Sequence, residues 1–126
     1  MAQIYDLIKG QRVYSVNPEH TVVEAARLMT EHNIGAVPVM RDATLVGILS
    51  ERDVLTRVVA AGRSPGITRV SEVMTANPRT VPPSESIENC IFMMREFGFR
   101  HLPVCDGAKV MGLVSVRDIA LHSAGA

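Results

Sequence analysis

The sequence predicts an α+β fold built from two copies of one small unit, and three observations carry this prediction. Residues 16–55 align over residues 81–120 without a gap, so the chain contains an internal repeat. Within each copy, apolar residues first recur at helical spacing and then form the short runs of buried strands. Apolar residues make up 47% of the 126 residues, which is enough for a packed core although only 4% are aromatic.

The repeat also sets the expected domain boundaries. Most aligned positions that are not identical exchange one apolar residue for another. The match extends upstream with one insertion, because Ile4–Ile8 resembles Val70–Met74. The identical pairs include Val16/Val81, Met29/Met94, Glu31/Glu96, Pro38/Pro103, Val39/Val104, Ala43/Ala108, Gly47/Gly112, Ser50/Ser115, Arg52/Arg117 and Asp53/Asp118. We therefore expect a first repeat over 4–60, a linker over 61–69 and a second repeat over 70–123.

Each copy begins with a short extended piece and a helix. The extended pieces, Tyr14–Val16 and Thr80–Val81, lead into proline-containing turns. In the first copy, Thr21 and Glu24 have the spacing of a capping box, and the apolar spacing predicts a helix that ends near residues 32–33.

The second copy predicts its helix from about Ile87 to Phe97, with Gly98 as the stop.

Two buried strands joined by a turn follow in each copy, and a hydroxyl residue then opens a second helix. The strands are predicted at Ala36–Met40, Leu45–Leu49, Leu102–Cys105 and Val110–Val114. The second helices begin after Ser50 and Ser115 and reach about Ala60 and Ser123. The order in each copy is β-α-β-β-α. Because one such small sheet cannot hide its apolar face alone, we expect the copies to pack with pseudo-twofold symmetry and to leave two equivalent clefts.

The charge and the cysteines exclude several classes of function. Thirteen basic side chains balance thirteen acidic ones, which argues against a nucleic-acid partner because such a partner favours a basic face. Cys90 and Cys105 form no CxxC pair and are interpreted as core thiols, with a redox or metal role as the alternative. The apolar runs are too short for a membrane span and the N-terminus does not resemble a signal peptide, so we expect a cytoplasmic protein.

The repeated Ser-x-x-Asp segment allows two interpretations. Ser50 and Asp53, like Ser115 and Asp118, have the spacing of an N-cap and the third helical residue, so capping alone explains them. The same geometry also suits a ribose, because a fixed carboxylate can accept hydrogen bonds from two adjacent hydroxyls. The two roles are compatible. Neither metal-ligand spacing nor a catalytic motif occurs in the sequence, so we expect no metal, no required cofactor and no enzyme activity.

The pattern resembles the cystathionine β-synthase (CBS) domain, and the pair resembles a Bateman module. The resemblance rests on Val37-Pro38-Val39, Leu102-Pro103-Val104 and the Gly-x-x-Ser-x-x-Asp end of each copy, over about residues 4–122. It implies a regulatory module, here expected to be stand-alone, which binds AMP, ADP, ATP, NAD or S-adenosylmethionine in the clefts. The resemblance also implies a homodimer that acts in trans on an effector protein.

The resemblance assigns roles to residues of this chain. It implies ribose binding by Asp53 and Asp118, with Ser50 and Ser115 beside them. Further candidates for ribose or phosphate contact are Arg52, Arg117, Arg100 and His101. The second copy alone offers Arg100 and His101, in the reverse of the order common in the family. The implied adenine slots comprise Val16, Asn17, Ile34, Gly35, Ala36 and Val37 in the first copy, and Val81, Pro82, Phe99 and Leu102 in the second.

Two other functions remain as alternatives at this point. The chain could be a structural or interaction dimer whose clefts hold no ligand. It could also be a redox protein or enzyme that uses Cys90 or Cys105.

Overall fold

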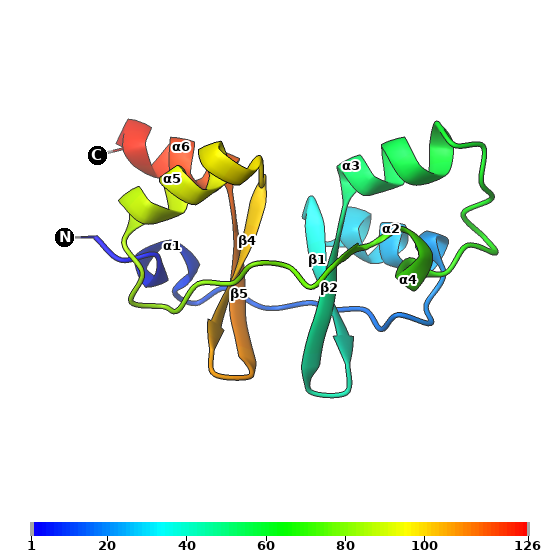
Figure 1. The fold of residues 1–126 in the computed structure, drawn as a ribbon, viewed down its shortest axis with the longest axis horizontal. Helices are drawn as coiled ribbons and strands as arrows, with labels where there is room; N and C mark the ends of the chain where they lie inside the picture. Colours follow the sequence, from blue (N-terminus) through cyan, green and yellow to red (C-terminus); the bar gives the residue numbers. More distant parts are fainter. Residues whose placement is uncertain (1, 126) are drawn as a thin grey trace. The chain divides into compact units, whose positions relative to one another are not determined.

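The computed structural model describes residues 2–125, which form two compact units (Figure 1). Unit A comprises residues 14–78, and unit B comprises residues 2–13 together with residues 79–125. Unit B is therefore discontinuous in the sequence. Each unit contains a β-hairpin with helices on one side of it, as the α+β prediction requires.

Unit A is built on an antiparallel hairpin. Strand β1 pairs with β2 from Ala36 opposite Ser50 to Arg41 opposite Thr44, and the short β3 adds to the free edge of β2. The elements of unit A are α2 (Val22–Glu31), β1 (Ala36–Arg41), β2 (Thr44–Ser50), α3 (Glu51–Val54), a π-helical segment (Leu55–Val59), α4 (Val70–Val73) and β3 (Thr75–Ala76).

Unit B repeats this hairpin with the same register. Strand β4 pairs with β5 from His101 opposite Ser115 to Asp106 opposite Lys109, and both hairpins carry an irregularity at the same place along the strand. The elements of unit B are α1 (Tyr5–Ile8), α5 (Ile87–Phe97), β4 (His101–Asp106), β5 (Lys109–Ser115) and α6 (Val116–Gly125).

The predicted helix ends are confirmed. Thr21 caps α2 in a reciprocal capping box with Glu24, and both hydrogen bonds of the box are present. Helix α5 runs over the predicted residues and ends at Gly98, whose φ of 72° lies in the left-handed region that glycine adopts without strain. After Ser50 the predicted helix is not uniform, because α3 continues as the π-helical segment.

The predicted first strand of each copy is reduced to a single bridge. Val16 forms a parallel bridge with Val39, and Val81 forms one with Val104. The β-pairing does not continue past these bridges, because Pro18 and Pro82 carry no backbone N–H and have a fixed φ.

Each unit has its own apolar core. Strands β1 and β4 contribute fully buried side chains to these cores, since Val37, Val39, Leu102 and Val104 have no exposed surface. The core of unit A consists of Val16, Val22, Ala25, Met29, Val37, Val39, Leu49, Val58, Val70 and Val73. The core of unit B consists of Ile4, Ile8, Val81, Ile87, Cys90, Met94, Leu102, Val104, Val114 and Ile119.

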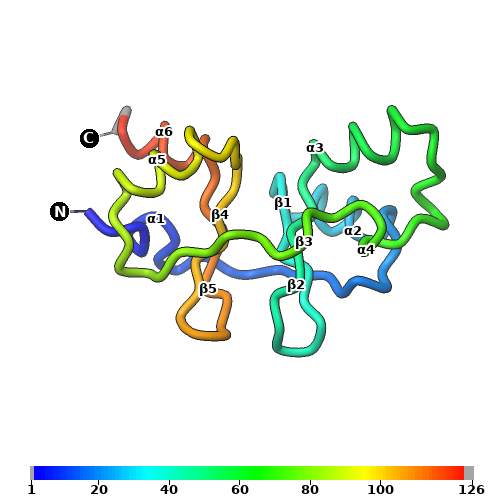
Figure 2. The backbone as a smooth tube through the Cα atoms, viewed as in Figure 1, coloured from blue at the N-terminus to red at the C-terminus, as the bar shows by residue number. Residues whose placement is uncertain are grey.

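The short helix at the start of each expected repeat packs with the rest of the other repeat. Helix α1 lies at the start of the first expected repeat, yet it packs with α5 and α6 in unit B, as the chain trace shows (Figure 2). Helix α4 lies at the start of the second expected repeat and packs in unit A. Equivalent hydrogen bonds hold the two helices, since Ile4 N–H donates to Glu85 (2.7 Å) and Val70 N–H donates to His20 (2.8 Å). The limits 4–60 and 70–123 stay a prediction for the sequence repeats, and the compact units differ from them because α1 and α4 are exchanged.

Candidate functional site

The two Ser-x-x-Asp segments form matching capping boxes. In unit A, Ser50 N–H donates to Asp53 Oδ2 (3.0 Å) and Asp53 N–H donates to Ser50 Oγ (3.1 Å). In unit B, the corresponding distances for Ser115 and Asp118 are 2.8 Å and 3.0 Å. The capping interpretation is therefore confirmed at both helix starts. Each box uses Oδ2 of the carboxylate as the backbone acceptor, and an ionised carboxylate has further lone pairs to offer.

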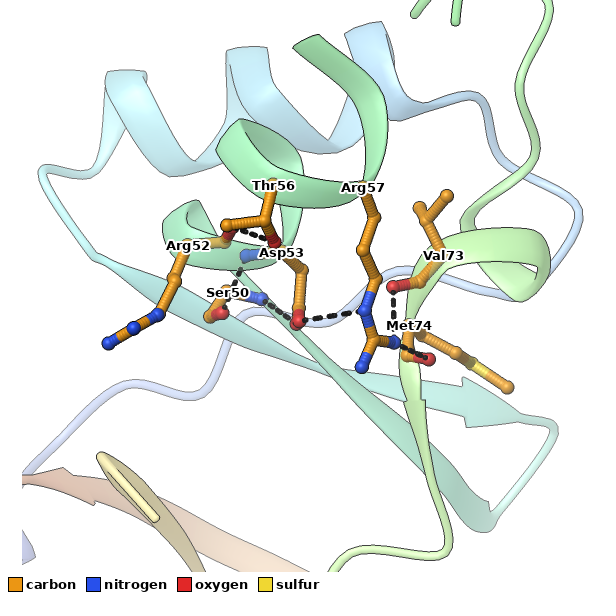
Figure 3. A network of polar contacts seen from close by, with 7 residues as sticks. All are labelled: Ser50, Arg52, Asp53, Thr56, Arg57, Val73 and Met74. Carbon is orange, nitrogen blue, oxygen red and sulfur yellow. Dashed lines mark hydrogen bonds and ion pairs between the residues drawn. The ribbon is translucent and has the colours of Figure 1, made fainter. Parts of the chain in front are cut away.

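The surroundings of the two carboxylates differ. Arg57, one helical turn after Asp53, places Nε 3.8 Å from Asp53 Oδ1, and its Nη1 donates to the carbonyl groups of Val73 (3.1 Å) and Met74 (3.0 Å) (Figure 3). This guanidinium ties the carboxylate to the end of α4. The Asp53 side chain retains only 12% of its surface.

Asp118 lies in a simpler environment. Its residue is half-buried, and the position equivalent to Arg57 is His122, which is exposed. Within the part of the chain that the structure describes, no ion pair like that of Asp53 is present at Asp118. The two repeats are therefore alike in backbone geometry and different in the charge that faces each carboxylate.

The structure brings the strand-start candidates next to the helix starts. The carbonyl of Gly35 accepts a hydrogen bond from Glu51 N–H (2.9 Å), and Ala36 lies opposite Ser50 in the hairpin.

In unit B, the carbonyl of Arg100 accepts from Val116 N–H (3.0 Å), and His101 lies opposite Ser115. The arginines inside the repeated motif, Arg52 and Arg117, are exposed, and the Arg52 side chain points away from Asp53 (Figure 3).

Most residues of the expected adenine slots belong to the cores. The buried ones are Val16, Ala36, Val37, Val81 and Leu102. Ile34 and Phe99 are partly buried and pack against the two cores. The Asn17 side chain accepts hydrogen bonds from Glu19 N–H (2.9 Å) and His20 N–H (3.1 Å), so it stabilises its own turn, and Pro82 is exposed. An adenine-binding role for these residues stays a prediction.

Sequence reasoning missed a stacked pair in each unit. The rings of Tyr14 and His32 stack at 3.6 Å between centroids, with 16° between their planes. At the equivalent positions of unit B, the Arg79 guanidinium lies 4.4 Å from the centroid of the Phe97 ring.

Phe97 also contacts Phe99, at 5.6 Å between ring centroids. The spacing of the repeats pairs Tyr14 with Arg79 and His32 with Phe97, but the residue types differ. Only the structure shows that both pairs stack.

The repeated glycines make room for the exchanged segments. A Cβ on Gly47 would lie 2.5 Å from Met74 Sδ and 2.9 Å from the carbonyl oxygen of Thr75. A Cβ on Gly112 would lie 2.8 Å from Gln11 Oε1 and 3.0 Å from Ile8 Cβ. These glycines therefore allow close packing of the residues that follow α4 and of α1.

The thiols are poor nucleophiles in this structure. Burial, with a smaller contribution from Glu85, raises the pKa of Cys90 to about 11. Burial also raises the pKa of Cys105, which is only partly covered. Both shifts reduce the thiolate fraction at neutral pH, which argues against the redox alternative. Among residues 2–125, no group of three or more His, Cys, Asp or Glu side chains could hold a metal ion.

A search for membrane-spanning segments over the described residues identifies no helix with the required length and apolar character.

Comparison with known proteins assigns the family. The model of the CBS domain matches residues 6–60 and again residues 70–125. The CBS domain-containing protein YhcV of Bacillus subtilis is 38% identical over 122 residues, which cover 97% of this chain and 86% of YhcV. A solved structure of a protein with CBS domains from Burkholderia ambifaria is 37% identical, has a TM-score of 0.92, and the match covers 98% of this chain and 95% of that one.

A third structure adds a ligand-bound example of the fold. The CBS domain pair of protein MJ0100, in complex with 5′-methylthioadenosine and S-adenosyl-L-methionine, has a TM-score of 0.88. The match covers 99% of this chain and 98% of that one, at 24% identity, so this likeness shows the fold alone. Two matched repeats, two hairpin units with the same register and the identity to YhcV lead to one conclusion. The chain belongs to the CBS domain family and contains a pair of CBS domains.

Proposed function

We propose that this protein is a regulatory module that binds an adenosine-containing small molecule and passes the signal to a partner protein. Asp53 and Asp118 accept hydrogen bonds from ribose hydroxyls, and Ser50 and Ser115 lie beside them. Candidate ligands are AMP, ADP, ATP, NAD and S-adenosylmethionine. The expectation that one ligand contacts both repeats stays a prediction.

The observation that carries this proposal is the fixed orientation of the two carboxylates. Each capping box holds its aspartate on the first helical turn through two hydrogen bonds of 2.8–3.1 Å. A carboxylate held in this way loses little conformational freedom when a ribose binds, which lowers the cost of binding. The MJ0100 pair supports the choice of ligand, because the same fold is solved there with two adenosine derivatives.

The regulatory part of the proposal follows from the ligand class and the family. A ligand shifts a protein between two arrangements only if it binds them with unequal affinity. We propose that the ligand-bound arrangement is recognised by a second protein, that the module is a cytoplasmic homodimer, and that it has no catalytic activity of its own.

A ligand-free interaction protein is the second candidate function, and one observation favours it. Leu55 and Val59 lie one turn apart on the π-helical segment and are 61% and 63% exposed. In unit B, Phe92 and Leu121 are similarly exposed. Neighbouring exposed apolar side chains that form a contiguous patch are typical of protein contacts. If this candidate is correct, saturating adenosine derivatives will leave the melting temperature of the protein unchanged.

The test is a thermal-shift screen with AMP, ATP, NAD, S-adenosylmethionine and adenosine. A specific ligand at a hundred times its Kd stabilises the folded state by about 2.7 kcal/mol. Asp53→Asn and Asp118→Asn keep an oxygen that can accept from the serine N–H, so the helix cap is retained. A smaller ligand-induced rise in melting temperature in these variants then reports on ligand binding and not on a lost cap. Asp106→Asn, in the exposed hairpin turn of unit B, is the matched control.

We expect at least one of the two Ser-x-x-Asp variants to lose most of the shift, while Asp106→Asn keeps it. An equal shift in the wild type and all three variants would show that the carboxylates are not the ribose contacts. A wild type that responds to none of the compounds would contradict ligand binding itself.

A further inference from the structure

Arg57 contacts two separate segments of unit A (Figure 3). Its Nε lies 3.8 Å from Asp53 Oδ1, and its Nη1 donates to the carbonyls of Val73 (3.1 Å) and Met74 (3.0 Å). The capping box uses Oδ2 of Asp53, so Oδ1 is the oxygen that faces the guanidinium. One side chain therefore joins the carboxylate on the first turn of α3 to the C-terminal end of α4.

The contacts of Arg57 hold a segment that has little regular structure of its own. Helix α4 is four residues long, and the carbonyls at the end of so short a helix have no partner within it. After α4 the chain forms the two-residue β3, and Asn77 N–H donates to the carbonyl of Val46 (3.1 Å). The chain then enters unit B at residue 79. The order of residues 70–77 thus depends in part on the Arg57 guanidinium.

The equivalent helix of unit B is held without such a side chain. The carbonyl of Ile8, which aligns with Met74, accepts from the backbone N–H of Gln11 (2.8 Å), so the turn after α1 supplies its own donor. The position equivalent to Arg57 is His122, which is exposed. Within the described residues, no hydrogen bond or ion pair joins His122 to Asp118 or to α1. A link from the capping carboxylate to the exchanged helix is therefore seen in unit A alone among residues 2–125.

The helix that carries Arg57 also differs from its counterpart in unit B. Leu55–Val59 is π-helical, and Ala60 N–H donates to the carbonyl of Leu55 (2.9 Å), five residues back. Helix α6 of unit B is α-helical over Val116–Gly125. Single π-helical turns are frequent at functional sites, and Arg57 lies within this one.

We propose that Arg57 is a latch through which Asp53 controls the order of residues 70–77. While Asp53 Oδ1 attracts the guanidinium, Arg57 is held against the carbonyls of Val73 and Met74. A ligand hydroxyl that donates to Oδ1 weakens this attraction, and the end of α4 is released. Control by a ligand rests on the proposed function, whereas the link from Asp53 through Arg57 to α4 does not. Arg57 is thus a positioning residue, and the first repeat alone transmits its occupancy in this way.

The link is tested without ligand, by hydrogen exchange and mass spectrometry of the full chain in a double-mutant cycle of Asp53→Asn and Arg57→Gln. Each single variant is expected to exchange about fivefold faster in residues 70–77, the effect of losing a partly exposed charge-assisted contact. The double variant is expected to exchange no faster than the faster single variant, because both changes break one linkage. Asp118→Asn and His122→Gln are the matched controls and should leave exchange in residues 4–11 unchanged.

Two results of this cycle would overturn the latch. Additive effects, or no effect of Asp53→Asn, would show that Arg57 holds α4 independently of Asp53. Faster exchange to the same extent throughout residues 14–78 would show a loss of global stability instead of a local release. Arg57→Lys keeps the charge but not the planar fork, so an intermediate rate in residues 70–77 is expected from it.

Control by a ligand is tested with AMP, ATP and S-adenosylmethionine on the wild type and on Arg57→Gln. For a compound whose thermal shift requires Asp53, we expect faster exchange in residues 70–77 of the wild type and no further change in Arg57→Gln. Unchanged or slower exchange in the wild type would overturn release by the ligand while the proposed function stands. If every thermal shift is independent of Asp53, ligand control of the latch is wrong, and if no compound gives a shift, the proposed function fails as well. The ligand-free cycle decides the link itself in both cases.

Discussion

Unit A and unit B have the same hairpin register and the same capping boxes, but different groups complete the outer edge of each hairpin. In unit A, the backbone of β3 pairs with β2, with Gly47 opposite Ala76 and Ile48 opposite Thr75. In unit B, the Gln11 side chain does this at the equivalent strand: its Nε2 donates to the carbonyl of Leu113 (3.1 Å), and its Oε1 accepts from the Leu113 N–H (2.8 Å). A side-chain amide thus takes the place of a strand.

This difference teaches that the repeat conserves geometry rather than residues. The same edge needs the same donor and acceptor, because a strand edge with unpaired backbone groups is open to other strands. In unit A, the backbone of β3 supplies the donor and the acceptor for this edge. Unit A also has the Arg57 guanidinium, which donates to the backbone of Val73 and Met74, whereas unit B has His122 at the equivalent position. Among the described residues, Asp118 therefore has no ion pair like that between Arg57 and Asp53.

The largest expected effect comes from weakening the packing of α1, one of the two exchanged helices. Ile4 is fully buried in the core of unit B, so Ile4→Ala should reduce the free energy of unfolding by about 2–5 kcal/mol. Hydrogen exchange measured by mass spectrometry should show faster exchange in residues 79–125 rather than in unit A. Tyr5→Ala, at a 38% exposed neighbour, is the control and should change little. Faster exchange in unit A alone would contradict the exchanged packing.

Gly47 and Gly112 allow a direct comparison of how tightly each unit packs against its exchanged segment. Gly47→Ala places a Cβ 2.9 Å from a backbone oxygen, whereas the closest atom to a Cβ in Gly112→Ala is the end of the flexible Gln11 side chain. We expect both variants to lose stability by about 1–3 kcal/mol, as is typical of overpacking, with the larger loss for Gly47→Ala. Urea denaturation of both variants measures the order. A larger loss for Gly112→Ala would mean that Ile8 Cβ, at 3.0 Å, is the more rigid obstacle.

Gln11 provides a smaller and more specific test. Gln11→Ala removes both side-chain hydrogen bonds to Leu113 and should cost about 1 kcal/mol, because water replaces part of what is lost at this exposed edge. Gln11→Glu keeps an acceptor for the Leu113 N–H but provides no donor for its carbonyl, so an intermediate stability is expected. Thermal melts of the three proteins are the measurement. Equal stability of wild type and Gln11→Ala would show that the edge needs no partner.

The effect of thiol ionisation at high pH should be confined to unit B, since unit A contains no cysteine. The folded-state pKa of Cys90, about 11, is above the usual thiol value of 9.0, so the folded protein holds this proton more tightly. The resulting stability is complete below pH 9 and is lost as the pH rises through 11. We expect the melting temperature of the wild type to fall over this range, and that of Cys90→Ala to fall less steeply. Identical slopes would show that the pKa of Cys90 is the same in the folded and the unfolded protein.

Local structure could be predicted from the sequence because its signals are local. The Thr21 and Glu24 capping box, the stop at Gly98 and the hairpin strands depend on residues a few positions apart. The capping role of Ser50 and Asp53 follows from the same short-range rule.

The exchange of α1 and α4 could not be predicted, because two copies with the same pattern offer the same groove to either helix. The contacts of Arg57 and Gln11 could not be predicted either, because each occurs in one unit only and depends on a partner that the fold brings close. The stacking of Arg79 on Phe97 could not be predicted from the repeat. The equivalent pair in unit A is Tyr14 and His32, so the aligned residues do not share a residue type that indicates stacking.

The position of α1 has a consequence for how the chain acquires its structure during synthesis. The residues of α1 leave the ribosome before unit A, whereas the strands that pack with Ile4 and Ile8 are made after unit A. Unit A is continuous and can fold as soon as residue 78 has emerged, while α1 must wait as an uncovered apolar segment. Closing unit B therefore joins two segments that are separated in the sequence by the whole of unit A, and this long-range step is expected to be the slow one.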